Sequence, residues 1–211
     1  MVSHRRDSLV REQTRAVNEL RALLVDYDPP AAARLGRLSS LKGFTQLAAL
    51  AADLDPHREV IAQLIRDLAG DCARRLTQIR QLTTRLETLM PQAGRRLINQ
   101  IDGCGVVSAA IIVAELAGTD LFATEAKFAM WAGAAPLDAS SGHNLHHRLN
   151  RTGNRQVNRA LHTIVITQIR HGGEAADYIA RRRREGKPYR AALRACKRHL
   201  ARRIWNILHD D

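Results

Sequence analysis

The segment around Ser140 and Ser141 has the residue types and spacing best suited to chemistry. Both serines precede Gly142, where the missing side chain lets another molecule approach the backbone closely. A serine hydroxyl is a weak nucleophile and needs a nearby base or positive charge to react. Candidates for both follow within ten residues of Ser141: His143, His146, His147, Arg148 and Arg151. The pattern indicates attack by serine on a phosphodiester, whose developing negative charge arginine neutralises.

The same segment leaves plainer alternatives open. Ser-Ser-Gly is also an ordinary turn sequence. His143 and His146 have the spacing of a zinc pair, but no second pair of ligands accompanies them, so we expect no metal site in this chain. The carboxylates nearby have no spacing that marks metal ligands: Asp102, Glu115, Asp120, Glu125 and Asp138. Any Mg²⁺ chemistry would therefore need ligands from elsewhere.

Positive charge is concentrated in the last third of the chain. The 211 residues include 33 Lys plus Arg against 21 Asp plus Glu, a formal net charge of +12. Residues 141–211 contain 16 basic and 5 acidic residues and so carry +11 of it. This clustering predicts a polyanionic partner, because arginine can hold phosphate oxygens in a bidentate fork. A solvated, arginine-rich surface is the alternative.

Two expected helices would present these charges. One, from about Asn154 to Arg170, turns an apolar stripe inward and places Arg151, Arg155 and Arg159 on another face. The second, from about Pro188 to His209, buries its own apolar stripe and is expected to expose six basic residues: Lys187, Arg190, Arg194, Lys197, Arg198 and Arg202. Both helices are therefore predicted to be amphipathic, with a cationic outer face.

A glycine-containing turn offers a second kind of phosphate contact. Residues 97–110 are typical of a helix, a tight turn with Gly103 and Gly105, and another helix. This resembles the helix-hairpin-helix motif, in which Gly-x-Gly brings backbone N–H groups to a nucleic-acid phosphate at a helix N-terminus. A turn that only packs two helices together remains the alternative.

The first part of the chain predicts long helices. One spans about Arg5 to Val25 and ends at Asp28-Pro29-Pro30, and a less regular one spans Ala31 to Ala52. A third begins at Asp55 and Pro56 and continues to Met90, which gives a rod on the order of 50 Å. Such a helix packs either in an intramolecular hairpin or against a second protomer in a coiled coil.

Composition sets the fold class. Hydrophobic residues make up 45% of the chain and aromatic residues only 4%, while Ala, Leu and Arg dominate, which favours helix over sheet. We therefore expect an all-α fold, with a helical hairpin or coiled coil in residues 1–92 and a compact helical domain in residues 93–211. The three separated cysteines fit a reducing cytoplasm, and we expect no membrane span and no export signal.

The ordered motifs from Leu97 to Leu208 resemble the carboxy-terminal domain of bacterial insertion-sequence transposases of the group numbered 110, 116 and 902. Residues 5–90 resemble the central coiled-coil region of that family. The motifs that carry the resemblance are Ile101-Asp102-Gly103-Cys104-Gly105, Phe128 to Pro136, Ala139-Ser140-Ser141-Gly142, His147 to His162, Glu185-Gly186-Lys187 and Ala192 to Arg198.

The resemblance implies a DNA transposase that cuts and rejoins DNA through a covalent phosphoserine. The family's serine corresponds to Ser141, with Ser140 as the fallback. Arg155, Arg159, Lys197 and Arg198 would contact DNA or position phosphate. Members act as homo-oligomers, and some use a guide RNA.

The resemblance also defines what this sequence lacks. Family members normally begin with an RuvC-like domain whose DEDD tetrad binds Mg²⁺, and none of the acidic residues here can be assigned to that tetrad. We therefore expect a truncated transposase that needs such a domain in trans. The alternative is a catalytically inactive remnant that dimerises and binds DNA or RNA.

Overall fold

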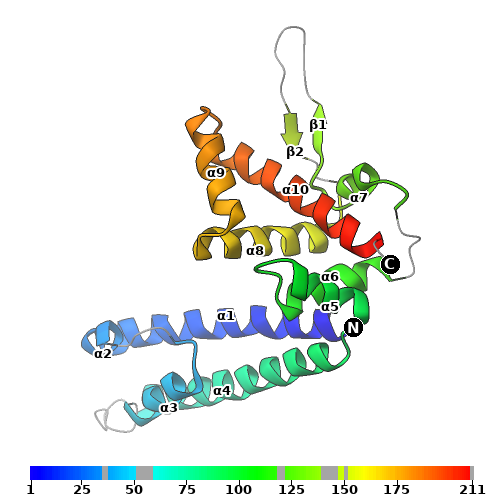
Figure 1. Ribbon diagram of the computed structural model, residues 1–211. Helices are drawn as coiled ribbons and strands as arrows, with labels where there is room; N and C mark the ends of the chain where they lie inside the picture. The colour runs from blue at the N-terminus through cyan, green and yellow to red at the C-terminus, as the bar shows by residue number, and fades with distance from the viewer. Residues whose placement is uncertain (35–37, 51–58, 118–121, 139–146, 150–151, 210–211) are drawn as a thin grey trace. The chain divides into compact units, whose positions relative to one another are not determined.

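The structure is a computed structural model in which the chain forms two compact units, Met1–Thr88 and Leu89–Asp211. The all-α class is confirmed, since the described residues form ten helices and one short two-stranded ribbon (Figure 1). The boundary lies close to the one expected at residue 92, and the roles expected of the two domains stay predictions. The described residues are 1–34, 38–50, 59–117, 122–138, 147–149 and 152–209.

The first unit contains an antiparallel pair of long helices, α1 (Val2–Tyr27) and α4 (Glu59–Thr88). Near the start of α1, Arg6 Nε donates to Thr83 Oγ1 near the end of α4 at 2.9 Å. The 30 residues of α4 span about 45 Å at 1.5 Å per residue. The intramolecular hairpin expected from the sequence is therefore present, and pairing with a second protomer stays a prediction.

Two shorter helices, α2 (Pro29–Arg34) and α3 (Leu41–Leu50), replace the single helix expected over residues 31–52, so that prediction is wrong. The start signal of α3 lies inside the expected helix, where Ser40 Oγ accepts from the Gly43 N–H at 3.1 Å. The helix start expected at residues 55–56 lies outside the described residues. The core of the unit joins α1, α3 and α4 through Leu20, Leu24, Phe44, Leu47, Ile65 and Cys72.

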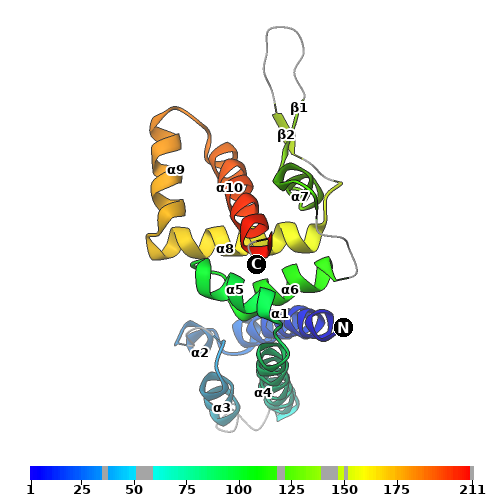
Figure 2. The same cartoon turned by 45° about the vertical axis from the view of Figure 1, so that its right-hand side comes forward.

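The second unit is built around two helices, α6 (Val106–Leu116) and α8 (Arg155–His171). The apolar side chains of α6 are mostly buried, and α8 buries Val157, Leu161, Ile164 and Val165, the stripe expected from its spacing. Four further helices complete the unit, with α9 and α10 packed against each other and against α8 (Figure 2): α5 (Gln92–Gln100), α7 (Glu125–Trp131), α9 (Glu174–Arg184) and α10 (Tyr189–His209).

A short antiparallel ribbon, β1 (Pro136–Asp138) and β2 (His147–Leu149), was not expected from the sequence. At its base the Asn154 N–H donates to the Trp131 carbonyl at 2.6 Å. Gly153 packs on the backbone of Gly133 so closely that a Cβ atom at Gly153 would overlap it. The chain therefore enters and leaves the ribbon at one fixed point.

Candidate nucleic-acid interface

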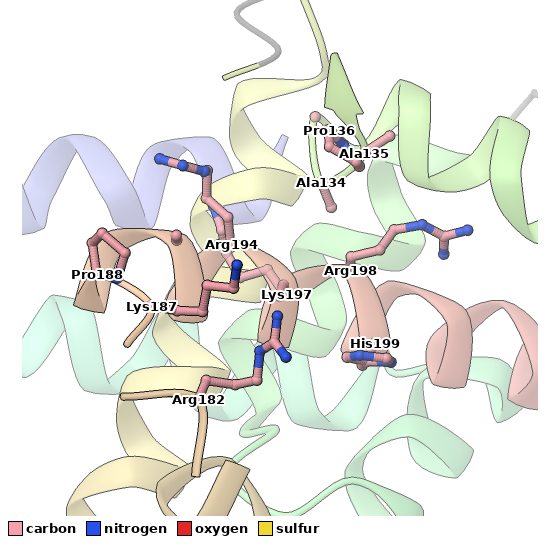
Figure 3. A pocket seen from close by; sticks show the side chains of 13 residues that line it. Ala134, Ala135, Pro136, Arg182, Lys187, Pro188, Arg194, Lys197, Arg198 and His199 are labelled. Carbon is pink, nitrogen blue, oxygen red and sulfur yellow. The ribbon is translucent and has the colours of Figure 1, made fainter. Parts of the chain in front are cut away.

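A pocket of about 590 Å³ lies in the second unit where α9, α10 and the segment Gly133–Pro136 meet. Figure 3 shows basic side chains of α9 and α10 facing Ala134, Ala135 and Pro136 across it. None of its described lining residues is Asp or Glu. Its five Lys and Arg residues are Arg182, Lys187, Arg194, Lys197 and Arg198, and His199 lines it as well.

The burial of Lys197 contradicts the sequence analysis, which placed it on the exposed face of the last helix. Lys197 is only 7% exposed, and Arg194 and Arg198 are half-buried rather than exposed. The reason is tertiary, since Lys197 lies beside Asn158 of α8 and lines the pocket that Gly133–Pro136 closes on another side. The expected exposure holds for the three remaining residues, Lys187, Arg190 and Arg202.

Asn158 connects Lys197 to the base of the ribbon. The Lys197 ammonium donates to Asn158 Oδ1 at 2.8 Å. Asn158 Nδ2 in turn donates to the carbonyl oxygens of Ala132 at 3.0 Å and Gly133 at 2.7 Å. These three contacts fix the orientation of the amide, because its oxygen faces the cation and its nitrogen faces the two acceptors.

Two of the five pocket cations have carboxylate partners. Arg182 Nη1 donates to Glu185 Oε2 at 2.5 Å, and Arg198 Nη2 donates to Glu125 Oε1 at 3.2 Å. Among the described residues, no carboxylate lies within ion-pair distance of the three remaining cations, Lys187, Arg194 and Lys197. The pocket therefore carries an excess of positive charge over the carboxylates that the described residues bring to it.

This excess is reflected in the titration of two groups. Burial lowers the pKa of the Lys197 ammonium below its ordinary value, and the nearby Arg194 charge lowers it further. The pKa of His162, on the adjacent α8, is lowered by burial and then by the Lys197 charge. An anion in the pocket would oppose the electrostatic part of both shifts, because it stabilises the protonated forms.

The glycine turn between α5 and α6 is held by neighbouring helices. Gly103 has φ +75° and lies so close to α8 that a Cβ atom would come within 3.1 Å of the Ile164 carbonyl. Gln168 Nε2 of α8 donates to the Asp102 carbonyl at 2.7 Å. Gly105 differs, because a Cβ atom there would meet nothing within 4 Å. Packing thus accounts for Gly103, whereas a role of Gly105 in phosphate contact stays a prediction.

The candidate nucleophiles Ser140 and Ser141 lie outside the described residues, as does Arg151. Both serines belong to the connection between β1 and β2, whereas Arg151 follows β2. Arg148 lies in β2, and its backbone pairs with Leu137. Arg155 and Arg159 both lie on α8 with exposed side chains, as expected. The structure thus brings Lys187, Arg194, Lys197 and Arg198 together and leaves Arg155 and Arg159 on a different helix.

Three residues of the pocket and its support were missed as site residues by the sequence analysis. Arg182 belongs to a run of four arginines at the end of α9, which gave no sign that one of them lines a pocket. His199 follows two basic residues on α10, and Asn158 lies in the motif from His147 to His162. For Asn158, its place in that motif was the only signal in the sequence. Helical periodicity gives no information about contacts between helices.

Neither a metal-binding cluster nor a membrane-spanning helix occurs in the described part of the chain. No group of three or more His, Cys, Asp or Glu side chains there could hold a metal ion. The Mg²⁺ expected with an RuvC-like domain therefore stays a prediction. Over the same residues, every helix is too short or too polar to cross a membrane.

The fold and the pocket define a mostly helical unit with a concentrated cationic site. Residues 95–180 of this unit match the sequence model of the Transposase IS116/IS110/IS902 family. The resemblance drawn from the sequence motifs is thereby confirmed, since this segment is similar to that family. The match ends before α10, which supplies three of the five Lys and Arg residues of the pocket.

Two curated relatives extend the likeness over most of the chain. The "Insertion element IS110 uncharacterized 43.6 kDa protein" of Streptomyces coelicolor is 25% identical over 96% of this chain and 60% of its own length. The "Probable family 20 transposase" of Pseudomonas aeruginosa is 27% identical over 81% of this chain and 48% of its own length. The chain thus matches about half to three-fifths of the length of these relatives.

Proposed function

We propose that this chain is the nucleic-acid-binding and serine-bearing part of an insertion-sequence transposase that recombines DNA in the cytoplasm. The family match of residues 95–180 supports the class of protein. The observation that carries the proposal is the cationic pocket, whose wall Gly133–Pro136 leads directly into the segment with Ser140 and Ser141. A site for a polyanion and a candidate nucleophile therefore lie close to each other in the sequence.

In the proposed reaction, the oxygen of Ser141 attacks a phosphorus atom of the DNA backbone. One Ser Oγ–P bond forms and one P–O bond of the backbone breaks, so the serine loses its proton and the departing strand oxygen gains one. Rejoining reverses these changes with a different strand end as the nucleophile. Ser140 is the fallback for this role. The cations of the pocket would bind the phosphate backbone near the reacting group.

The resemblance further motivates three parts of the proposal. DNA at the ends of the element and at the target would be the substrate, a second copy of the chain would complete a homo-oligomer, and a guide RNA would be used as in some members of the family. An RuvC-like domain would supply Mg²⁺ ligands, because the described residues offer no metal-binding cluster of their own.

The test is to trap a covalent protein–DNA adduct on element-end DNA with Mg²⁺, with and without an RuvC-like partner domain. Ser141→Ala should abolish the adduct and leave DNA binding unchanged, while Ser140→Ala serves as the matched control. An adduct that depends on Ser140 instead would move the nucleophile by one residue.

If both variants still formed the adduct, that result would contradict a serine nucleophile at these positions. Salt-sensitive DNA binding with no adduct under any condition would favour the alternative, an inactive protein that binds DNA or RNA and dimerises. The absence of DNA binding even at low salt would overturn both readings, since each requires the cationic face to bind a polyanion.

A further inference from the structure

The pocket contains more positive charge than its carboxylate neighbours balance. Arg182 and Arg198 each have a carboxylate partner, whereas Lys187, Arg194 and Lys197 have none within the part of the chain that the structure describes. Like charges that share a confined, partly dry space disfavour one another. An anion that enters the pocket would offset this repulsion.

Lys197 is the most enclosed of these cations. The residue is 7% exposed, and its single hydrogen-bond partner among the described residues is Asn158. An ammonium group has three donors, so two remain for a ligand in the pocket that Lys197 lines. An anion would supply the pairing that a buried cation otherwise lacks.

Asn158 determines where that ammonium lies. Its Nδ2 is held by the Ala132 and Gly133 carbonyls at 3.0 and 2.7 Å, so its Oδ1 presents a fixed acceptor to Lys197. Gly133 itself lines the pocket. The anion site and the base of the β1–β2 ribbon therefore share one hydrogen-bond network.

We propose that this pocket binds one phosphate group of a nucleic-acid strand, with Lys197 as the central binding residue and Asn158 as its positioning residue. That the phosphate belongs to a nucleic acid rests on the proposed function. That the pocket binds phosphate rests on the pocket alone. Arg194 and Lys187 complete the site from α10 and the loop before it.

The chemistry of the lining suits phosphate. Arginine and lysine together hold phosphate oxygens through a bidentate fork and a point charge. The volume of about 590 Å³ lies within the range of roughly 300–1,000 Å³ found for small-ligand pockets. Ala134, Ala135 and Pro136 give the pocket an apolar wall (Figure 3), against which the sugar and base that adjoin the phosphate would lie.

The first experiment measures binding of inorganic phosphate to the full chain by calorimetry and by thermal shift. Lys197→Met and Arg194→Met should each lower phosphate affinity about tenfold or more, since each removes charge-assisted hydrogen bonds. Arg190→Met is the matched control, because Arg190 is exposed on the same helix and does not line the pocket. It should bind phosphate as the unaltered chain does.

Asn158 is tested by the geometry that it supplies. Asn158→Ala should weaken phosphate binding severalfold without removing charge, and Asn158→Gln should restore part of the affinity if an amide acceptor for Lys197 is what matters. Circular dichroism and melting temperature verify that each variant folds. Equal phosphate affinity in Asn158→Ala and the unaltered chain would contradict the positioning role.

A final comparison separates the two sources of phosphate and the two proposals. A trinucleotide with a 5′-phosphate should bind more tightly than its 5′-hydroxyl form if the pocket takes a strand end, and equally if it takes an internal phosphodiester. No phosphate binding, or the same loss in Arg190→Met as in Arg194→Met, would overturn the pocket as a phosphate site. DNA binding that persists in that case would leave the proposed function standing.

Discussion

The turn at Gly103 and the pocket at Lys197 were both expected to contact phosphate, and they differ in how their polar groups are used. At the turn, Gln168 binds the Asp102 carbonyl and α8 packs against Gly103. In the pocket, Lys197 is buried with one neutral partner and no neighbouring carboxylate among the described residues. Polar groups that the fold already satisfies need no ligand to explain them, whereas uncompensated buried charge does.

The largest expected effect concerns DNA affinity. The double variant Lys197→Met/Arg194→Met should bind DNA at least about tenfold more weakly at low salt, and the slope of log K against log salt should fall by about 1 in magnitude, since the pocket takes one phosphate. Fluorescence anisotropy across a salt series measures both quantities. Gly105→Ala, which removes no charge, should change the slope little. If it weakened binding more than the double variant, the turn rather than the pocket would be the main contact.

Stability should distinguish the two glycines of the turn. Gly103→Ala should lower the free energy of unfolding by about 1–3 kcal/mol, because φ is +75° and the new Cβ would approach the Ile164 carbonyl. Gly105→Ala should cost only about 0.5 kcal/mol as a poorer N-cap. Urea unfolding of the two variants gives the comparison. Equal losses would show that Gly103 is not held by α8 as described.

A substitution in the pocket should increase stability, in contrast to the two glycine substitutions. Lys197→Met should raise the free energy of unfolding by about 1 kcal/mol at pH 7 without phosphate, since it removes a buried cation that lacks a carboxylate partner. Added phosphate should stabilise the unaltered chain by mass action and the variant much less. Thermal melts with and without phosphate test both statements. Destabilisation of the variant in both conditions would indicate that the Asn158 contact outweighs the buried charge.

The smallest expected effect is on a titration. The pKa of His162 is lowered by burial and then by the Lys197 charge, so Lys197→Met should raise it toward its ordinary value of 6.5. The neutral imidazole is favoured in the folded chain, so a contribution to stability present above pH 6.5 is lost as the pH falls through the lowered pKa. Removing Lys197 should reduce that loss. Proton NMR of the His162 ring measures the pKa, and an unchanged value would contradict the coupling.

Helical periodicity predicted much of this fold because it records which face of a helix is apolar. Val157, Leu161, Ile164 and Val165 follow that period and are all fully buried in α8. The prolines after Asp28 correctly marked the end of α1. Each of these features is local, so the sequence around it was sufficient to predict it.

Features that depend on contacts between distant segments were not predictable in this way. The three-residue strands β1 and β2 are too short for an alternating pattern to emerge. Lys197 follows a polar period along its own helix, but the residues that enclose it come from α8 and from Gly133–Pro136. The distribution of charged residues along the sequence correctly indicated positive charge in the last third of the chain. It could not show which of these charges lie in one pocket.

The contact between Gly133 and Gly153 bears on how this domain could diversify. Entry to and exit from the ribbon are fixed at one crossing, which consists of backbone atoms of these two glycines and uses no side chain of the connection between β1 and β2. We therefore expect changes in the length of that connection to be tolerated as long as both glycines are kept. A bulky residue at either glycine would disturb the crossing itself. Protein engineers who graft new loops between β1 and β2 would therefore have to keep this pair of glycines.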